Sequence, residues 1–408
     1  MTGISSSAEA VLAADPDTRV RRAVRALLEP ACRCPRKHGK EIMKVGVSPV
    51  FQRIGFTRSD YEVYHNELAL ADLAEPLGFD SIWTTEHHFT DYEMIPSPLQ
   101  FLTYMAGRTK RIRLGTMVVV IPWHDPLRVA EEISVLENLS GGRMILGIGR
   151  GLGRVEFEGF RVPMEKSRPI FNEHAENILS SLETGYFESD GDWSKVPRRA
   201  LRPTPFESFH GRTFIAGISP ETVPLAVKHG AGMLVIPSKS WGEVSADLKR
   251  FEDAWSAERP TDPRPRPLAA AFTYVDKDPK RAADIATKHI GEYWNSVLDH
   301  YEIRQTKFDQ VAGYNHYKGM SDAANSDVDQ VIRNFVDQMM WGTPDQVLEK
   351  VDWLRATLDI STLICHFSFT GMPYELANRS MRLFAEEVLP VLHSWGVSSH
   401  VKPASEPS

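Results

Sequence analysis

The stretch FDSIWTTEHHFT, which covers Phe79–Thr90, contains the features around which the rest of the chain is organised. Its first half, Phe79–Thr84, is rich in β-branched and aromatic residues and predicts a short buried strand. The stretch then presents a carboxylate and two imidazoles, from Glu86, His87 and His88. Titratable side chains where a strand stops are typical of a site that uses a sheet as its scaffold. Position alone therefore favours a functional role over that of structural histidines.

Strands and helices alternate on both sides of this stretch. Apolar runs predict strands at Val45–Val50, Phe79–Thr84, Ile112–Ile121, Arg143–Ile148, Arg212–Ala216, Met233–Ile236, Leu268–Tyr274 and Ser361–Phe367. The segments between them predict helices, at Asp60–Leu77, Pro98–Arg108, Pro126–Leu139, Arg168–Thr184, Pro220–His229, Ser240–Ser256, Pro279–Tyr301, Asp345–Thr357 and Pro373–Leu389. Short loops between alternating strands and helices indicate a parallel sheet, and eight strands close such a sheet into a (β/α)8, or TIM, barrel.

Other segments lack this rhythm. Residues 1–42 are expected to be a poorly ordered N-terminal extension, 43–395 the barrel, and 396–408 a flexible tail. Phe187–His210 has no clear period and is expected to be an excursion at one end of the barrel. Gln305–Ala324 is polar with scattered aromatic residues, and a long loop of this kind is usually a lid or disordered.

Composition excludes several classes of protein. The 408 residues carry 47 Lys and Arg against 54 Asp and Glu, and a net charge of −7 argues against non-specific nucleic-acid binding. The three cysteines, Cys32, Cys34 and Cys365, supply neither a disulfide framework nor a four-cysteine zinc site. No apolar run is long enough for a membrane span or a signal peptide, so the expected location is the cytoplasm.

The orientation of the histidines argues against a metal. Adjacent side chains on an extended segment point to opposite faces, so His87 faces one way and Glu86 and His88 face the other. A pair of histidine ligands usually has helical i,i+4 spacing instead. We therefore expect no metal site here.

Two further segments follow predicted strands and could bind an anion. GIGRGLGR (Gly147–Arg154) allows close approach of the backbone and offers arginine donors, although Leu152 breaks a dinucleotide fingerprint and a plain glycine turn is as good an explanation. GISPET (Gly217–Thr222) opens a helix with Ser219 as its cap, which is either an anion site or ordinary capping. Arg168 opens another helix and either reaches the same phosphate or is a surface charge.

Taken together, three blocks resemble the bacterial luciferase-like flavin monooxygenases. They are EHHFT, VVVIPWHDPLRVAEE, and LSGGR with GIGRG, at Glu86–Thr90, Val118–Glu132 and Leu139–Gly151. The resemblance covers roughly residues 43–390 and is to the luciferase α subunit. It implies a (β/α)8 barrel with a lid over residues 305–333. It also implies reduced FMN from a separate NAD(P)H-dependent flavin reductase, reaction with O₂ through a C4a-peroxyflavin, and insertion of one oxygen atom into a small organic substrate.

The resemblance also implies roles for individual residues. His87 matches the catalytic histidine, and because the non-catalytic β subunit has Asn there and lacks the Arg150-Gly151 pair, this chain is expected to be catalytic. The implied cofactor-binding positions are Glu86, Met117, Val118, Gly149, Arg150, Leu152, Arg168, Ile218, Ser219 and Thr222. Met117–Val118 is where the family often has a non-prolyl cis peptide. The lid and the aromatic residues Trp83, Phe89 and Trp123 are expected to exclude water.

Departures from the luciferase pattern leave alternatives open. Gly149 stands where luciferase has cysteine, and Ile218 where it has glutamate, so light emission from a long-chain aldehyde is not expected. The alternatives are a hydride-transfer oxidoreductase that uses the deazaflavin F420 on the same fold, and a non-catalytic flavin-binding partner subunit. The expected partners are a small-molecule substrate, a flavin reductase and a second copy of the chain in a homodimer, with no nucleic acid and no membrane.

Overall fold

A closed barrel of parallel strands forms the centre of the protein. The computed structural model describes residues 42–54, 58–217 and 221–396, and the statements below concern these residues. Hydrogen bonding passes from each barrel strand to the next and returns from the last to the first. In spatial order the strands are β1 (Lys44–Val47), β2 (Ser81–Thr84), β3 (Arg113–Thr116), β5 (Met144–Gly149), β8 (Thr213–Ala216), β9 (Gly232–Val235), β10 (Leu268–Val275) and β12 (Thr362–His366). The predicted (β/α)8 barrel is therefore confirmed.

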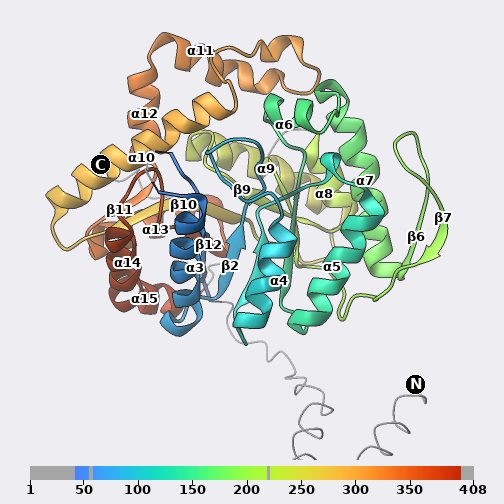
Figure 1. Ribbon diagram of the computed structural model, residues 1–408, viewed down its shortest axis with the longest axis horizontal. Coiled ribbons are helices and arrows are strands. Elements are labelled where there is room, and N and C mark those ends of the chain that lie inside the picture. The colour runs from blue at the N-terminus through green and yellow to red at the C-terminus, as the bar shows by residue number, and fades with distance from the viewer. Residues whose placement is uncertain (1–41, 55–57, 218–220, 397–408) are drawn as a thin grey trace, which may run out of the picture. The chain divides into compact units, whose positions relative to one another are not determined.

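A helix follows each barrel strand and covers the outside of the sheet (Figure 1). These helices are α3 (Asp60–Leu77), α4 (Pro98–Arg108), α5 (Pro126–Ser140), α7 (Ser167–Thr184), α8 (Thr222–Lys228), α9 (Trp241–Glu258), α10 (Pro279–His300) and α14 (Tyr374–Leu383). A further strand and helix, β11 (Met340–Gly342) and α13 (Pro344–Leu358), lie between α10 and β12 in the chain. At the start of α5, Asp125 accepts a hydrogen bond from the Arg128 amide and caps the helix. None of the described helices is long and apolar enough to cross a membrane.

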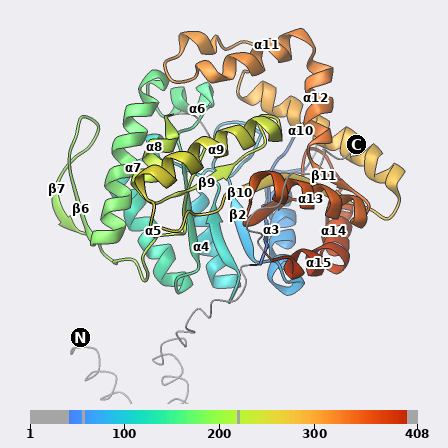
Figure 2. The same ribbon diagram turned by 180° about the vertical axis from the view of Figure 1, so that it is seen from behind.

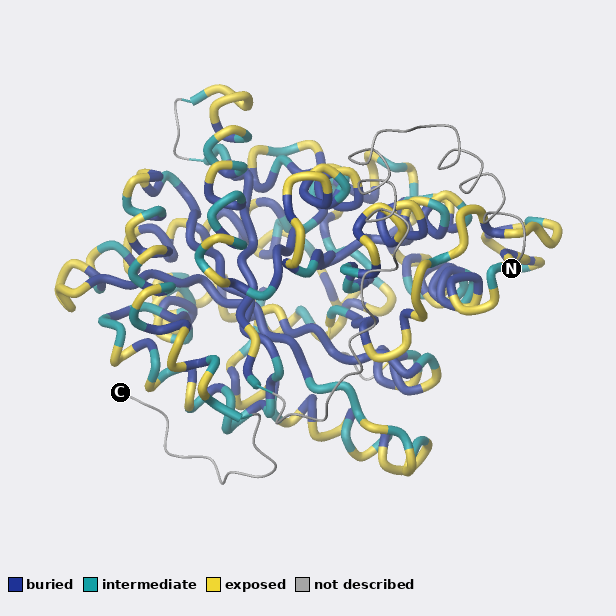
Figure 3. The backbone as a smooth tube through the Cα atoms, turned by 90° about the horizontal axis from the view of Figure 1, so that it is seen from below, coloured by how far each residue is buried: buried dark blue, intermediate teal, exposed yellow. Residues whose placement is uncertain are grey.

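The barrel strands are mostly buried, and the centre of the molecule is buried in Figure 3. Trp83 fills the interior and is fully buried, with its indole N–H donating to the Ser81 hydroxyl over 2.7 Å. Neighbouring strands make room for it with glycine, since a Cβ at Gly46 would lie 2.5 Å from Trp83 Nε1 and one at Gly115 2.2 Å from Trp83 Cε3. Trp83 lies one residue before the end of β2, as predicted, but its side chain packs inside the barrel and is not part of the cavity wall described below, which argues against a role in excluding water from the site.

The predicted single strand Ile112–Ile121 is wrong. The chain instead forms β3, a cis peptide between Met117 and Val118, β4 (Val119–Val120) and a 3₁₀ turn over Ile121–Trp123. The break occurs where β2 ends at Thr84, so β3 loses that hydrogen-bonding partner after Thr116. Beyond the break the chain pairs with β5 alone, Val119 opposite Ile148. An unbroken apolar run does not report where a neighbouring strand stops.

Other boundaries also differ from expectation. The excursion at Phe187–His210 begins as an antiparallel hairpin, β6 (Tyr186–Asp190) and β7 (Lys195–Ala200), beside α7. The helix expected at Pro220–His229 begins at Thr222, and its predicted cap, Ser219, lies outside the described residues. The last predicted helix passes through a π-helical turn at Phe384–Val388 and continues as α15 (Leu389–Ser394).

The segment expected to be a lid is helical in large part. It contains 3₁₀ turns at Phe308–Gln310 and Asn315–Tyr317, followed by α11 (Lys318–Ser326) and α12 (Val328–Asp337). Figures 1 and 2 show α11 and α12 at the same end of the barrel as α6 (Arg154–Gly159), which follows the carboxyl end of β5. The lid segment therefore lies over the end of the barrel where the strands present their carboxyl termini.

Candidate active site

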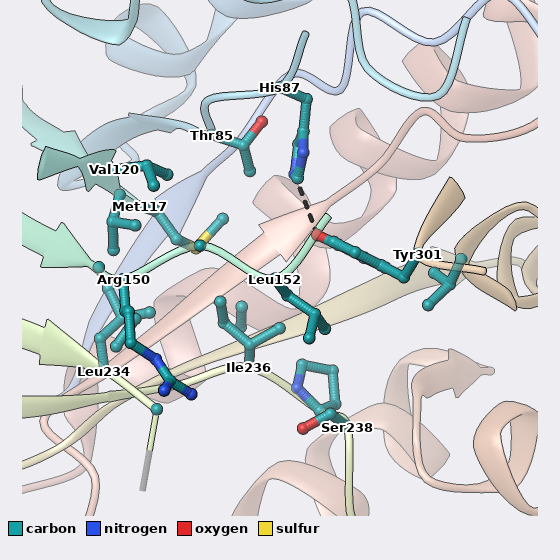
Figure 4. A pocket seen from close by; sticks show the side chains of 18 of the residues that line it. Thr85, His87, Met117, Val120, Arg150, Leu152, Leu234, Ile236, Ser238 and Tyr301 are labelled. Atoms are coloured by element: carbon teal, nitrogen blue, oxygen red, sulfur yellow. Dashed lines mark hydrogen bonds between the residues drawn. The ribbon is translucent and has the colours of Figure 1, made fainter. Parts of the chain in front are cut away.

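A cavity of about 250 Å³ opens at this end of the barrel (Figure 4). Its walls include His87, Arg150, Arg168 and Thr222, which come from the loops and helices after β2, β5 and β8. These four residues therefore line one cavity, and their roles in catalysis and anion binding stay predictions. Ile218 and Ser219, also expected there, lie outside the described residues.

One end of the cavity carries positive charge. Arg150, Arg168 and Lys239 line it, and Lys239 forms an ion pair with Asp247 at 3.0 Å. Arg168 Nη1 donates to the Thr222 hydroxyl over 3.4 Å. Burial and the nearby Arg150 lower the pKa of Arg168 to about 10. Partly buried guanidinium groups held near one another favour a multiply charged anion such as a phosphate, since it would relieve their repulsion. We refer to this part, Arg150, Arg168, Thr222 and Lys239, as the cationic end.

The lid is fastened to the cationic end through Arg150. The Arg150 guanidinium donates to the Gly313 carbonyl over 2.9 Å and lies 3.8 Å from the centre of the Tyr314 ring. The Tyr314 hydroxyl donates in turn to the Gly151 carbonyl over 2.9 Å. The lid thus contacts the loop that the sequence assigns to the cofactor. The sequence did not predict the contact of Tyr314 with Arg150 and Gly151, because Tyr314 lies in a segment without a regular pattern and no other feature distinguishes it.

The wall beyond the cationic end is apolar. Met117, Val118, Leu152 and Leu234 line it, together with the backbone of Gly149. The Met117–Val118 peptide is cis, as the resemblance implies. The structure also explains why Gly149 is glycine: a Cβ there would lie 2.4 Å from Val118 Cγ2. The cysteine of luciferase would not fit at this position without a shift of Val118.

The other end of the cavity carries histidine, glutamate and tyrosine side chains. His87 Nδ1 lies 3.1 Å from Glu156 Oε1, and Nε2 lies 3.4 Å from the Tyr301 hydroxyl (Figure 4). Burial disfavours the charged imidazole, but the Glu156 carboxylate, with smaller effects of Glu93 and Glu86, more than offsets burial and raises the pKa of His87. Burial likewise disfavours the charged form of Glu156, yet His87 and His300 lower its pKa to about 2.

Sequence reasoning missed Glu156. The residue is 0% exposed and lies in α6, which starts shortly after the glycine-rich loop. It is separated from His87 by 69 positions, so no local pattern joins the two. The available signal was its position in the first turn of a helix at the carboxyl end of a barrel strand, where site residues gather.

Glu86 has a structural role that the sequence did not predict. Its carboxylate accepts hydrogen bonds from His124 Nε2 over 2.5 Å and from the Val120 amide over 2.8 Å, and it pairs with His88 Nε2 at 3.2 Å. His87 meanwhile faces Glu156, so the predicted opposition of His87 to Glu86 and His88 is confirmed. Although Glu86 is part of the cavity wall, protein donors occupy its oxygens. It ties the loop after β2 to the segment after the cis peptide, and its contact with a cofactor stays a prediction.

Three side chains at this end have the separation of a possible cation site. The ligand atoms of His87, Glu156 and His300 all lie within 4.8 Å of one another. Hydrogen bonding accounts for the same spacing, because a carboxylate between two imidazoles is a common hydrogen-bonded arrangement. The expectation of no metal here stays a prediction.

A (β/α)8 barrel with polar and charged groups gathered at the carboxyl ends of its strands is the architecture of a TIM-barrel enzyme. Comparison with known proteins narrows this class. The profile described as luciferase-like monooxygenase matches residues 43–359, and the chain belongs to this family. It is accordingly an oxidoreductase of the monooxygenase type.

Relatives and solved structures agree with this family. The alkanal monooxygenase alpha chain of Photorhabdus luminescens is 25% identical over 82% of this chain and 93% of its own length. The oxygenase component of a flavin-dependent trigonelline monooxygenase from Acinetobacter baylyi is 26% identical over 60% of this chain and 68% of its own length. A monooxygenase structure from Streptomyces bottropensis has a TM-score of 0.70 and 26% identity, covering 86% of this chain and 99% of that one. The oxygenating constituent of 3,6-diketocamphane monooxygenase from Pseudomonas putida, in complex with FMN, has a TM-score of 0.66 and 22% identity over 86% and 98%.

Proposed function

We propose that this protein is the oxygenase of a two-component system. It would take reduced FMN from a separate NAD(P)H-dependent flavin reductase and use O₂ to insert one oxygen atom into a small organic substrate. The observation that carries the proposal is a single cavity with a cationic end, an apolar wall and a histidine whose base strength is raised by a buried carboxylate. The names of the relatives support the cofactor and the reductase, since one is an oxygenase component and another structure holds FMN.

The residues present fit FMN. Arg168 and Thr222 would hold its phosphate, because charge-assisted hydrogen bonds from a partly buried arginine suit a dianion. Met117, Val118 and the backbone of Gly149 would lie against the ring system, where glycine leaves room for close approach. When bound, reduced FMN supplies the activation of O₂.

The side chains of the chain itself would control protons and water. His87 would act as a general base or hydrogen-bond partner through Nε2, a role that contributes typically ~10²–10⁴-fold to rate. Trp123, Tyr301 and the lid residue Tyr317 line the cavity and would keep water out. Of the predicted aromatic residues, Phe89 is 61% exposed and does not contribute to this shielding.

The other readings make different predictions. An F420-dependent hydride transferase would bind the deazaflavin and, once reduced, would not react with O₂. A partner subunit would bind flavin but would keep full function in a reconstituted system without His87. A homodimer in the cytoplasm is part of our proposal on the resemblance alone, and light scattering of the purified protein tests the dimer.

The decisive experiment combines binding and oxygen reaction. We expect FMN to bind more tightly than riboflavin, and the anaerobically reduced complex to return to oxidised flavin more slowly than free reduced FMN after mixing with O₂. Reoxidation is followed by flavin absorbance in a stopped-flow instrument, with the His87→Ala protein as the matched control. Binding of F420 in place of FMN, or reoxidation at the rate of free flavin, would contradict the proposal.

A further inference from the structure

A chain of buried polar side chains leads away from the cavity behind His87. It starts at Thr90, in the loop after β2, whose hydroxyl lies 2.8 Å from His300 Nδ1 at the end of α10. His300 Nε2 lies 3.5 Å from Glu156 Oε1, and His87 Nδ1 lies 3.1 Å from the same oxygen. Three separate parts of the chain therefore converge on one carboxylate.

A backbone hydrogen bond and the space left by a glycine hold the Glu156 carboxylate beside these side chains. The backbone amide of His88 also donates to Glu156 Oε1, over 3.0 Å. A Cβ at Gly153 would come within 2.4 Å of Glu156 Oε2, so glycine at this position makes room for the group. Side chains that the fold accommodates in this way have a fixed position, and burial with histidine partners keeps the carboxylate ionised.

The hydrogen-bond partners indicate which ring nitrogens of His87 and His300 carry protons. An ionised carboxylate only accepts, so His87 carries a proton on Nδ1, and in its neutral form it directs an unprotonated Nε2 to the cavity. His300 Nε2 lies 3.5 Å from Glu156 Oε1, an ion-pair distance, and its Nδ1 lies 2.8 Å from the Thr90 hydroxyl. If this hydroxyl donates to Nδ1, the proton of a neutral His300 is on Nε2 and faces the carboxylate. In a neutral imidazole one ring nitrogen donates a hydrogen bond and the other accepts one, so the partner of one nitrogen determines the role of the other.

We propose that Glu156 is a positioning residue that fixes the tautomer and the base strength of His87, and that His300 adjusts both through the same carboxylate oxygen. The use of this base rests on the function proposed above, whereas the tautomer and the proton affinity do not. A proton taken from the cavity at Nε2 would make an imidazolium paired with Glu156, and it would leave again from Nε2. Neither Glu156 nor His300 touches the reacting atoms in this account.

The variants have opposite expected effects. Glu156→Gln removes the carboxylate that does most to raise the pKa of His87, while burial, which lowers it, and the smaller effects of Glu93 and Glu86 remain, so the pKa of His87 falls. His300→Phe removes a donor from the carboxylate, which then holds the His87 proton more strongly, so the pKa of His87 rises. The other titratable groups that face His87 are Glu86, Glu93, Tyr92 and Tyr301, and they are unchanged in both variants.

The experiment is NMR of the full chain labelled with ¹⁵N histidine, without cofactor or substrate. Loss of one signal in His87→Ala assigns the residue, and its ring nitrogen shifts report tautomer and pKa directly. The matched control is Glu67→Gln, which alters another buried glutamate that accepts a backbone amide hydrogen bond but lies outside the cavity wall. It is expected to leave the tautomer of His87 unchanged.

The expected result is an Nδ1–H tautomer in the parent protein, with a titration midpoint that moves down in Glu156→Gln and up in His300→Phe. If the neutral form of His87 in the parent protein carries its proton on Nε2, the proposal is overturned. This test needs no variant, so it holds even if a variant fails to fold. An unchanged midpoint in Glu156→Gln would also overturn it. Because no flavin or oxygen is involved, these results are separate from failure of the oxygenase proposal.

Discussion

The two ends of the cavity differ in which parts of the protein contact their charged groups. At the cationic end, Arg150 and Arg168 lie near one another, and the lid contacts Arg150 through a carbonyl and an aromatic ring. At the histidine end, Glu156 is enclosed by an amide and two imidazoles that the fold holds in place. The first arrangement is completed by a segment that could move aside, and the second is complete within the barrel and its helices.

This difference suggests a division of labour. A cationic end that the lid borders suits a ligand that arrives and leaves with its own negative charge. A fully hydrogen-bonded histidine suits a group that must keep one orientation through every turnover. Variants at the two ends should therefore separate cofactor binding from the chemical step.

The largest expected effect is at the histidine end. We expect His87→Ala to lower product formation by ~10²–10⁴-fold, because it removes the base, and to release hydrogen peroxide instead. FMN affinity should change little, since the phosphate contacts lie at the other end. Product and peroxide are measured in the same reaction. Normal rates in this variant would mean that the role assigned to His87 is wrong.

The next effect is at the cationic end. Arg168→Ala should weaken FMN binding by ~10–100-fold, which corresponds to the loss of a hydrogen bond to a charged group. Riboflavin lacks the phosphate, so its affinity should be nearly the same in the parent and the variant. Fluorescence titration with both flavins measures this, and Arg128→Ala, which removes an arginine with a 70% exposed side chain, is the control. Equal affinity of the parent for FMN and riboflavin would refute this assignment.

A smaller effect is expected where the lid meets the cationic end. Tyr314→Phe keeps the ring near Arg150 but removes the hydroxyl bonded to the Gly151 carbonyl, a loss of about 1 kcal/mol. We expect faster proteolytic cleavage within the lid segment 305–326, and a larger increase in Tyr314→Leu. Tyr61→Phe, at a residue that is 69% exposed, is the control. Cleavage at the parent rate in both Tyr314 variants would show that this contact does not hold the lid.

The smallest effect concerns the dependence of stability on pH. Burial raises the pKa of Glu93, whose carboxylate accepts from the Tyr293 hydroxyl over 3.0 Å. The folded protein therefore keeps this proton to higher pH than the unfolded chain does. Stability contributed by the protonated group is present below the unfolded pKa and declines as pH rises through the raised folded pKa. Denaturant unfolding should show the parent losing stability relative to Glu93→Gln over this interval, whereas a constant difference would contradict the shift.

The barrel was predictable because its signals are local. Strand and helix patterns repeat along the chain, and caps such as Asp125 with Pro126 mark the helix starts, so α3 and α4 begin and end where expected. The apolar run that includes Met117 was wrongly predicted as one strand because its break depends on where another strand stops. The sequence likewise places Trp83 near a strand end but does not show that its side chain turns into the barrel. That placement depends on glycines in neighbouring strands, which leave space for the ring.

The site was predictable only in part, for the same reason. His87, Arg150 and Arg168 were found because each lies beside a strand end or a helix start, and a resemblance connected them. Glu156 and His300 were not found, since their importance comes from contacts across the fold, over 69 positions between His87 and Glu156. Local pattern thus identifies the groups that face a ligand more readily than the groups that hold them.

The central claim is that one cavity holds a flavin between a phosphate site and His87. A crystal structure of the protein with FMN tests it most directly. We predict that the phosphate will contact Arg168 and Thr222, that the ring system will lie against Met117 and Val118, and that His87 will face the ring. A phosphate bound elsewhere, or a ring that does not share the cavity with His87, would contradict the account.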